Sequence, residues 1–268
     1  MRKLIPSWFV LVAVMLPTAG QTPGPVPLIQ AHSHNDYEQK RPLFDALDLG
    51  FCNIEADIYL VEGQLLVAHE REQVQPGKTL QALYLDPLRA HVKRNQGRVF
   101  RDGPTVTLLI DVKTDAEKTY AVLRGVLKEY QEMLTVFQSG QAKTNAVTAI
   151  ISGNRPRKML AEEPVRYAAY DGRLEDLDSN EPNSFIPWIS DDWTKHFEWR
   201  GGGPFPGNQK QELRQILEKA HQQGRKVRFW ATPDRAEVWS ELVKGGVDII
   251  IADNLSALQR FLLLNKRR

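Results

Sequence analysis

The sequence predicts an α/β fold, a (β/α)8 TIM barrel, from three observations. Short runs of branched apolar residues alternate with helix-like segments through most of the 268-residue chain. Seven or eight such pairs in roughly 250 residues match a closed barrel of parallel strands with right-handed crossovers. No GxGxxG turn follows the first predicted strand, which disfavours the alternative of an open, doubly wound sheet.

The expected strands are runs rich in Val, Ile, Leu and Phe, and most of the expected helices carry apolar residues at helical spacing. Gly50, Gly224 and the pair Gly245-Gly246 follow three of these helices, as glycine often does. The predicted strands are Leu28–Ala31, Phe51–Leu60, Leu65–Ala68, Val106–Lys113, Asn145–Ile151, Val165–Ala169, Phe185–Ser190, Lys226–Trp230 and Val247–Ala252. The predicted helices are Pro42–Leu49, a stretch within 79–95 that Pro87 breaks, Asp115–Phe137, Gln209–Gln223, Ala236–Lys244 and Ser256–Leu264.

The amino-terminal segment has the pattern of a signal peptide. Arg2 and Lys3 form a short basic start, Leu4–Leu16 is mostly apolar, and small residues follow at 17–20. The apolar run is shorter than the ~20 residues that span a bilayer as a helix. We therefore predict that residues 1–20 are a signal peptide that directs export to the periplasm or the medium, with an uncleaved anchor as the alternative.

The rest of the chain reads as one unit. Residues 21–27 (QTPGPVP) are predicted to be an extended lead-in, and residues 28–268 a single barrel domain. The formal net charge of +2 falls to zero once the two basic residues of the signal peptide are removed, so nucleic acid is not an expected partner. The single cysteine, Cys52, excludes an intrachain disulfide.

Polar side chains interrupt or follow several of the predicted strands. Residues two apart in a strand face the same side, so Glu55 pairs with Asp57 and Asp111 with Lys113. If these strands end at the carboxyl-terminal rim, the four side chains converge there with two histidines. Those histidines are His32 and His69.

This set of residue types suits metal-assisted acid–base chemistry. Three carboxylates with open positions favour Mg²⁺ or Ca²⁺ over zinc. Two histidines across a substrate can serve as base and acid because imidazole titrates near neutrality. A Glu-x-Asp pair alone is more often structural, so the prediction depends on the ordered set, each member lying in or just after a predicted strand.

The motifs also resemble a known superfamily. The chain is similar to phosphodiesterases with a phospholipase C-type barrel, which include glycerophosphodiester phosphodiesterases and sphingomyelinase D-like phospholipases. Residues 76–88 (PGKTLQALYLDPL) resemble the branch named after altered inheritance of mitochondria protein 6. The motifs that carry the resemblance are AHSHNDY (31–37), IEADIYL (54–60), LLVAHE (65–70), LLIDVKT (108–114), RFWATPD (228–234) and GVDIIIADN (246–254).

The resemblance implies metal-assisted cleavage of a glycerophosphodiester, another phosphodiester or a phospholipid. In this scheme His32 would attack the phosphorus or deprotonate the attacking group, and His69 would protonate the leaving oxygen. One Mg²⁺ or Ca²⁺ would be held by Glu55, Asp57 and Asp111. Lys113 would neutralise phosphate charge, Trp230 would close over the substrate, and His34 and Asn35 would support the site.

Two departures from the glycerophosphodiesterase pattern limit what the resemblance implies. Ser33 stands where those enzymes usually carry arginine, and Asp111 stands where they usually carry glutamate. Glycerol recognition is therefore left open, and so is the nucleophile. Water would give hydrolysis, whereas a neighbouring hydroxyl of the substrate would give a cyclic phosphate.

Two other functions fit parts of the pattern. The pair His32-x-His34 also opens the metal sites of amidohydrolase-type barrels, but the later strands here lack the further histidines such sites need. A non-catalytic ligand-binding barrel is the second alternative. The expected partner is a small phosphodiester or phospholipid, with transient contact to a membrane surface. The aromatic residues Trp188, Trp193, Trp199 and Phe205 are candidates to line a lipid-accepting mouth.

Overall fold

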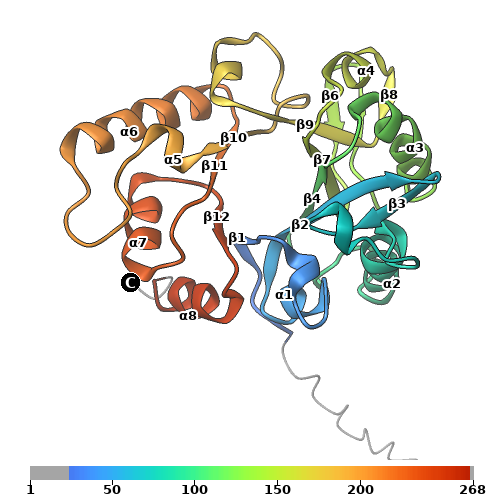
Figure 1. The fold of residues 1–268 in the computed structure, drawn as a ribbon, viewed down its shortest axis with the longest axis horizontal. Helices are drawn as coiled ribbons and strands as arrows, with labels where there is room; N and C mark the ends of the chain where they lie inside the picture. Colours follow the sequence, from blue (N-terminus) through green and yellow to red (C-terminus); the bar gives the residue numbers. More distant parts are fainter. Residues whose placement is uncertain (1–23, 266–268) are drawn as a thin grey trace, which may run out of the picture.

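The computed structural model describes residues 24–265, and these form a nearly closed barrel of parallel strands with helices outside it (Figure 1). The predicted signal peptide lies outside the described residues. Within residues 24–265, no helix has the length and apolar character needed to cross a bilayer. The barrel strands are β1 (Leu28–Ser33), β2 (Phe51–Val61), β4 (Val106–Val112), β7 (Val147–Gly153), β9 (Ala168–Gly172), β10 (Trp188–Asp192), β11 (Lys226–Trp230) and β12 (Ile250–Ala252).

The strand order is β12-β1-β2-β4-β7-β9-β10-β11, with parallel pairing at every step. The last strand meets β11 through one parallel bridge between Arg228 and Ile249, where the Ile249 amide donates to the Val227 carbonyl at 3.2 Å. This one bridge brings the two ends of the sheet together, so the ring is nearly closed. The predicted fold class is confirmed.

The helices form the outer layer, and Figure 1 shows α1 to α4 on one side of the barrel and α5 to α8 on the other. Apolar residues alternate along the barrel strands and pack against the helices in one continuous core. The α-helices are α1 (Phe44–Asp48), α2 (Asp86–Arg94), α3 (Ala116–Lys128), α4 (Arg157–Glu162), α5 (Trp193–His196), α6 (Gly207–Gln222), α7 (Ala236–Gly245) and α8 (Leu255–Asn265). Short 3-10 turns are η1 (Asp36–Glu38), η2 (Arg71–Gln73) and η4 (Leu174–Asp178).

The predicted strand after β2 exists but is not a barrel strand. β3 (Gln64–Val67) folds back antiparallel on β2, with Leu60 opposite Leu65. The hairpin turn contains Glu62 and Gly63, which both have positive φ, as a tight two-residue turn requires. The hairpin carries His69 back to the carboxyl end of the barrel.

The long helix predicted over Asp115–Phe137 is wrong at its carboxyl end. α3 ends at Lys128, and the chain continues into a small antiparallel sheet made of β5 (Val136–Gln138), β6 (Gln141–Lys143) and β8 (Val165–Arg166). The turn at Ser139-Gly140 has positive φ at both residues, which suits a hairpin. The apolar residues just before this turn therefore belong to β5, the middle strand of this sheet.

The predicted break at Pro87 is also wrong. A π-helical turn, η3 (Gln81–Leu85), leads directly into α2, and Pro87 lies in the first turn of that helix. The Asp86 amide donates to the Gln81 carbonyl in this wider turn. A proline in a first turn has no interior helical hydrogen bond to lose, so the helical path continues.

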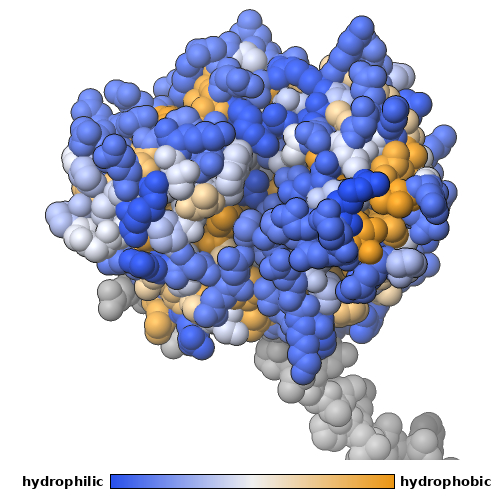
Figure 2. Space-filling view, viewed as in Figure 1, coloured by the Kyte–Doolittle hydropathy of each residue, from blue (hydrophilic) through white to orange (hydrophobic). Residues whose placement is uncertain are grey.

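Most of the surface seen in Figure 2 is hydrophilic, and the apolar residues on that face form small, separate groups. The tryptophans and Phe205 expected at a lipid-accepting mouth are instead buried. Trp193 packs among Phe197, Phe205 and Phe229 with ring centroids 4.2 to 5.7 Å away. Packing around α5 and the start of α6 accounts for Trp193, Trp199 and Phe205, whereas Trp188 packs beside the buried His32.

Candidate active site

The site lies where the carboxyl ends of β1, β2, β4 and β7 meet. Asp57 of β2 is in register with Asp111 of β4, which is in register with Ser152 of β7. Parallel strands bring these positions to one height at one end of the barrel. Gly153 follows Ser152 with φ +66°, and a Cβ there would lie 2.2 Å from the Asp111 Oδ1. Only glycine fits beside that carboxylate.

Three carboxylates form a compact cluster at this end. Glu55, Asp57 and Asp111 each offer an oxygen within 4.8 Å of the others. The Asp57 Oδ2 accepts hydrogen bonds from the Tyr37 hydroxyl at 2.7 Å and from the Lys113 Nζ at 3.0 Å. The Asp57 Oδ1 is buried without a hydrogen-bond partner among the described residues. A buried, unpartnered carboxylate oxygen beside two further carboxylates fits a hard divalent cation.

The charges in this cluster are not balanced by protein groups alone. Burial, together with the charges of Glu55 and Asp111, raises the pKa of Asp57 to about 6. Burial also raises the pKa of Asp111. Lys113 opposes these effects, and the two aspartates raise its own pKa although burial lowers it. A bound cation would favour the ionised form of all three carboxylates.

Two buried side chains bind the carboxylate of Glu55. Its Oε2 lies 2.8 Å from the His32 Nε2 and 3.0 Å from the Arg228 Nη1, and all three residues are at most 5% exposed. Burial alone would raise the pKa of Glu55, but Arg228 and the His32 hydrogen bond hold it well below its ordinary value. Glu55 is thus ionised and fixed in place before any ligand binds.

The structure places His32 away from the pocket. Its side chain is 0% exposed and packs edge-on against Trp188, with ring centroids 6.2 Å apart. Burial lowers the pKa of His32 to about 4, and its Nδ1 has no hydrogen-bond partner among the described residues. A neutral imidazole that donates its one proton to Glu55 fits this setting. A group that attacks a substrate must reach the pocket, so the role predicted for His32 does not suit this position.

His34 lines the pocket instead, together with Asn35. The His34 ring is 28% exposed, and its Nδ1 lies 2.8 Å from the Asp253 Oδ1 in the loop after β12. Burial lowers the pKa of His34, but the hydrogen bond to Asp253 and the charges of Glu55 and Asp253 outweigh it and raise the pKa. Asn35 adopts a left-handed conformation, φ 44° and ψ 46°, as the chain turns into η1.

His69 approaches from the other side of the carboxylates. Its side chain is 41% exposed and lines the pocket, and its Nδ1 lies 3.1 Å from the Tyr37 hydroxyl and 3.4 Å from the Asp57 Oδ2. The Tyr59 hydroxyl donates to the His69 backbone carbonyl at 2.9 Å. His69 therefore lies at the pocket, beside the carboxylate cluster.

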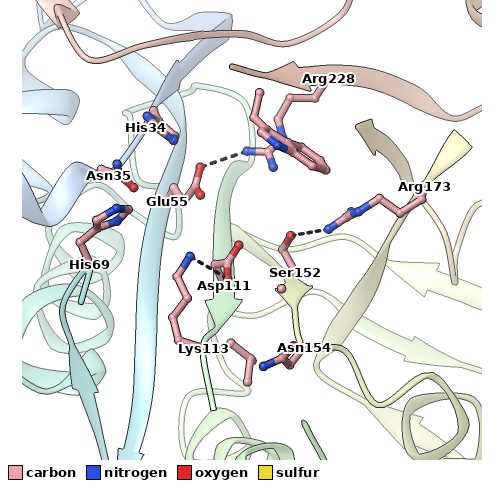
Figure 3. A pocket seen from close by; sticks show the side chains of 13 residues that line it. His34, Asn35, Glu55, His69, Asp111, Lys113, Ser152, Asn154, Arg173 and Arg228 are labelled. Carbon is pink, nitrogen blue, oxygen red and sulfur yellow. Dashed lines mark hydrogen bonds and ion pairs between the residues drawn. The ribbon is translucent and has the colours of Figure 1, made fainter. Parts of the chain in front are cut away.

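These groups enclose a pocket of about 400 Å³, shown in Figure 3. Lys113, Arg173 and Arg228 bring three cationic groups to its wall, and Arg173 stacks on Trp230 with 4.8 Å between the guanidinium carbon and the ring centroid. Arg173 is also paired with the buried Asp171 at 2.8 Å. Such a pocket can hold a small anionic group between the carboxylate cluster and the arginine wall.

Several pocket residues were not predicted from the sequence. Arg228 lies two residues before Trp230 on the same face of β11, so strand alternation was a usable signal for it. Ser152 and Arg173 lie at the carboxyl ends of β7 and β9, where barrel sites are usually found. The remaining unpredicted pocket residues are Val112, Gly153 and Asn154, and Tyr37 lies just behind the pocket wall.

The structure does not favour the amidohydrolase alternative. His32 points to Glu55 and His34 to Asp253, so the two histidines have separate partners. Within residues 24–265, the group of side chains that can hold a metal consists of carboxylates only.

Ser33, found where glycerophosphodiesterases usually have arginine, is buried and donates to Asp36 at 2.7 Å.

Solved structures share the fold. A glycerophosphodiester phosphodiesterase from Parabacteroides distasonis superposes with a TM-score of 0.54 at 15% identity, covering 89% of this chain and 98% of that one. A calcium-dependent phosphoinositol-specific phospholipase C from a Pseudomonas species gives a TM-score of 0.57 at 13% identity, covering 85% and 89%. At these identities the likeness concerns the barrel itself.

Sequence relatives give a closer relationship. An altered inheritance of mitochondria protein 6 homolog from Arthroderma benhamiae is 32% identical over 90% of this chain and 85% of its own length. The protein of that name from Saccharomyces cerevisiae is 27% identical over 84% of this chain and 68% of its own length. The model of the AIM6-like phosphodiesterase domain matches residues 23–171, which include the carboxylate cluster, the buried His32 and the two pocket histidines, His34 and His69. The chain therefore belongs to the family of AIM6-like phosphodiesterase domains.

Proposed function

We propose that this protein is a metal-assisted phosphodiesterase in which His34 and His69 transfer the protons. One observation carries the proposal: these two histidines line one pocket together with Glu55 and Asp111, and the buried Asp57 completes the carboxylate cluster beside them. The first catalytic role moves from His32 to His34, because only His34 reaches the pocket. Membership of a phosphodiesterase-like family supports the reaction class.

The histidines supply the proton route. His34 accepts the proton of the attacking hydroxyl, and Asp253 orients the ring and stabilises the imidazolium that forms. The new P–O bond forms as the bond to the leaving alcohol breaks. His69 gives a proton to the leaving oxygen, so the product alcohol departs neutral.

Positive charge in the pocket favours the transition state over the bound diester. Glu55, Asp57 and Asp111 would hold one Mg²⁺ or Ca²⁺, which when bound supplies a Lewis acid for a phosphoryl oxygen. Lys113 and Arg228 add fixed cations next to the same carboxylates. The description of one solved neighbour as calcium-dependent supports testing both ions.

The substrate is a small phosphodiester, with glycerophosphodiesters and lysophospholipids as the first classes to test. The far wall offers Ser152, Asn154 and Arg173 as hydrogen-bonding groups and Trp230 as a flat apolar surface. Such a wall suits a polar head group better than an acyl chain. The nucleophile is either a water molecule or a neighbouring hydroxyl group of the head group.

The test is phosphorus NMR of product mixtures from a panel of glycerophosphodiesters, lysophospholipids and bis(p-nitrophenyl) phosphate. We expect cleavage with added Mg²⁺ or Ca²⁺ and none after chelation. The product spectrum separates a monoester from a cyclic phosphate. Absence of metal-dependent cleavage across the panel would remove the proposal and favour a ligand-binding barrel, which thermal-shift measurements with the same compounds would detect.

A further inference from the structure

The Tyr37 hydroxyl occupies a junction between the carboxylate cluster and His69. Three possible acceptors of its proton surround it: the Asp57 Oδ2 at 2.7 Å, the Asn35 Oδ1 at 2.7 Å and the His69 Nδ1 at 3.1 Å. The ring is half-buried against the hydrophobic core, which fixes the hydroxyl at this point. The proton route described above does not use this group.

The single proton of this hydroxyl determines what its neighbours must do. A phenol has one proton to donate and two lone pairs that accept. The carboxylate of Asp57 is the strongest acceptor of the three, because hydrogen bonds to ionised groups are the strongest. The Tyr37 proton therefore goes to Asp57, and the phenol oxygen is left as an acceptor for His69.

It follows that the proton of neutral His69 sits on Nδ1. We propose that Tyr37 is a positioning residue that holds His69 as the Nδ1–H tautomer and leaves Nε2 as the nitrogen that exchanges protons in the pocket. Asp57 cannot replace Tyr37 as the acceptor for the His69 Nδ1 unless one of the side chains moves. The His69 Nδ1 lies 3.4 Å from the Asp57 Oδ2, beyond the ordinary range of 2.7–3.2 Å for such a bond.

The catalytic part of this inference rests on the proposed function, but the tautomer does not. Long-range proton–nitrogen NMR spectra report which imidazole nitrogen carries the proton, whether or not the protein cleaves a diester. We expect the Nδ1–H form of His69 in the wild type. In Tyr37→Phe the acceptor is lost, so the neutral ring should shift to the Nε2–H form that free histidine prefers. An Nε2–H signal in the wild type, or an unchanged Nδ1–H signal in Tyr37→Phe, would overturn the proposal.

Tyr59→Phe is the matched control. It also removes a hydroxyl that contacts His69, but that hydroxyl binds the backbone carbonyl and not the ring. We expect the tautomer signal of Tyr59→Phe to match the wild type. A change as large as that in Tyr37→Phe would show that general loosening of the loop causes the effect, and would overturn the specific role of Tyr37.

The kinetic readout is dependence on the leaving group. A misplaced proton donor slows the loss of an alkyl alcohol, which needs a proton, far more than the loss of p-nitrophenol, which does not. We expect Tyr37→Phe to reduce turnover of an alkyl diester about ten-fold more than that of bis(p-nitrophenyl) phosphate, roughly 1.4 kcal/mol of selective transition-state stabilisation. In a His69→Ala background the same substitution should add no further selectivity. Equal losses on both substrates, or additive losses in the double variant, would overturn the positioning role, whereas no cleavage at all would count against the proposed function alone.

Discussion

Two layers of polar side chains stand one above the other at the carboxyl end of the barrel. The inner layer consists of His32, Asp171 and Ser190, and the rim layer of His34, His69, Asp111 and Lys113. Glu55 and Arg228 connect the layers. Glu55 binds His32 and Arg228 binds Ser190, and both residues line the pocket. The inner groups are buried and largely paired with one another, whereas the rim groups face the pocket.

The two histidines of the His-x-His pair show what the layers do to chemistry. Burial lowers the pKa of His32 to about 4, which keeps it neutral. His34, two residues later, has a raised pKa because Asp253 and Glu55 outweigh a smaller loss of water. Identical side chains thus become a structural donor and a candidate base. The burial and partners of each residue decide its role, and its place in a motif does not.

Removal of the metal should cause the largest loss of turnover and should leave the inner layer unchanged. A Lewis acid worth several kcal/mol in the transition state corresponds to a loss of roughly a thousand-fold or more in turnover. The inner layer fixes Glu55 without a metal, so the circular dichroism spectrum should stay unchanged after chelation. Assays with and without chelator check this. A large loss of helical signal would show that the two layers are not independent.

Substitution of the two histidines separates the layers directly. His34→Ala should lower kcat by about a thousand-fold, as loss of a proton-transfer group does, and leave the unfolding midpoint almost unchanged. His32→Ala should cost about 3 kcal/mol of stability, because it removes a buried hydrogen bond to a charged group and leaves a cavity. The His32→Ala molecules that remain folded should have a turnover rate within about ten-fold of the wild-type rate. Steady-state kinetics and urea unfolding of both variants are the measurements, and the reverse pattern would return the catalytic role to His32.

The stability that His32 provides should depend on pH. Its pKa is lower in the folded protein than the ordinary value of 6.5, so the unfolded chain takes up the proton first as pH falls. The contribution is fully present above pH 6.5 and is lost as pH falls towards about 4, a change on the order of 3 kcal/mol. In metal-free protein, the difference in unfolding free energy between wild type and His32→Ala should shrink across this window. A constant difference would mean that His32 is not buried in neutral form.

The smallest effect is expected at the far wall of the pocket. Arg173→Ala should raise KM about ten-fold with little change in kcat, because it removes a hydrogen-bonding group for the substrate, worth about 1.4 kcal/mol. Arg155→Ala is the matched control: its guanidinium binds the backbone of the same strand but does not line the pocket. An equal rise in KM in both variants would indicate that the strand itself has shifted.

The sequence predicted the barrel well where periodicity alone decides structure. β11 was predicted with its observed bounds, and the cores of β1, β2, β4 and β7 were found within a few residues. The errors came where turn geometry or pairing decides. Ser139-Gly140 signals a hairpin that the apolar spacing of the preceding helix obscured. Pro87 looked like a break because a widened π-helical turn cannot be read from composition.

The site could be predicted only in part, for a related reason. Strand alternation placed Glu55 with Asp57 and Asp111 with Lys113, and the register of β2 and β4 joins these pairs. Strand alternation predicts which side of the sheet a residue faces, but not how far along the barrel axis its side chain lies. It therefore did not separate His32 from His34, and it gave no sign that Tyr37 from η1 would reach Asp57 and His69.

The sequence by itself determined the fold class, the family and the residue types of the carboxylate cluster, because local periodicity and motif order are written along the chain. The tertiary structure decided which histidine is sealed beneath Glu55 and which opens to the pocket. It also brought Asp253, Arg228 and Tyr37 to the same site from distant parts of the chain. Burial and long-range partners control the protonation of these groups, and both exist only once the barrel has closed.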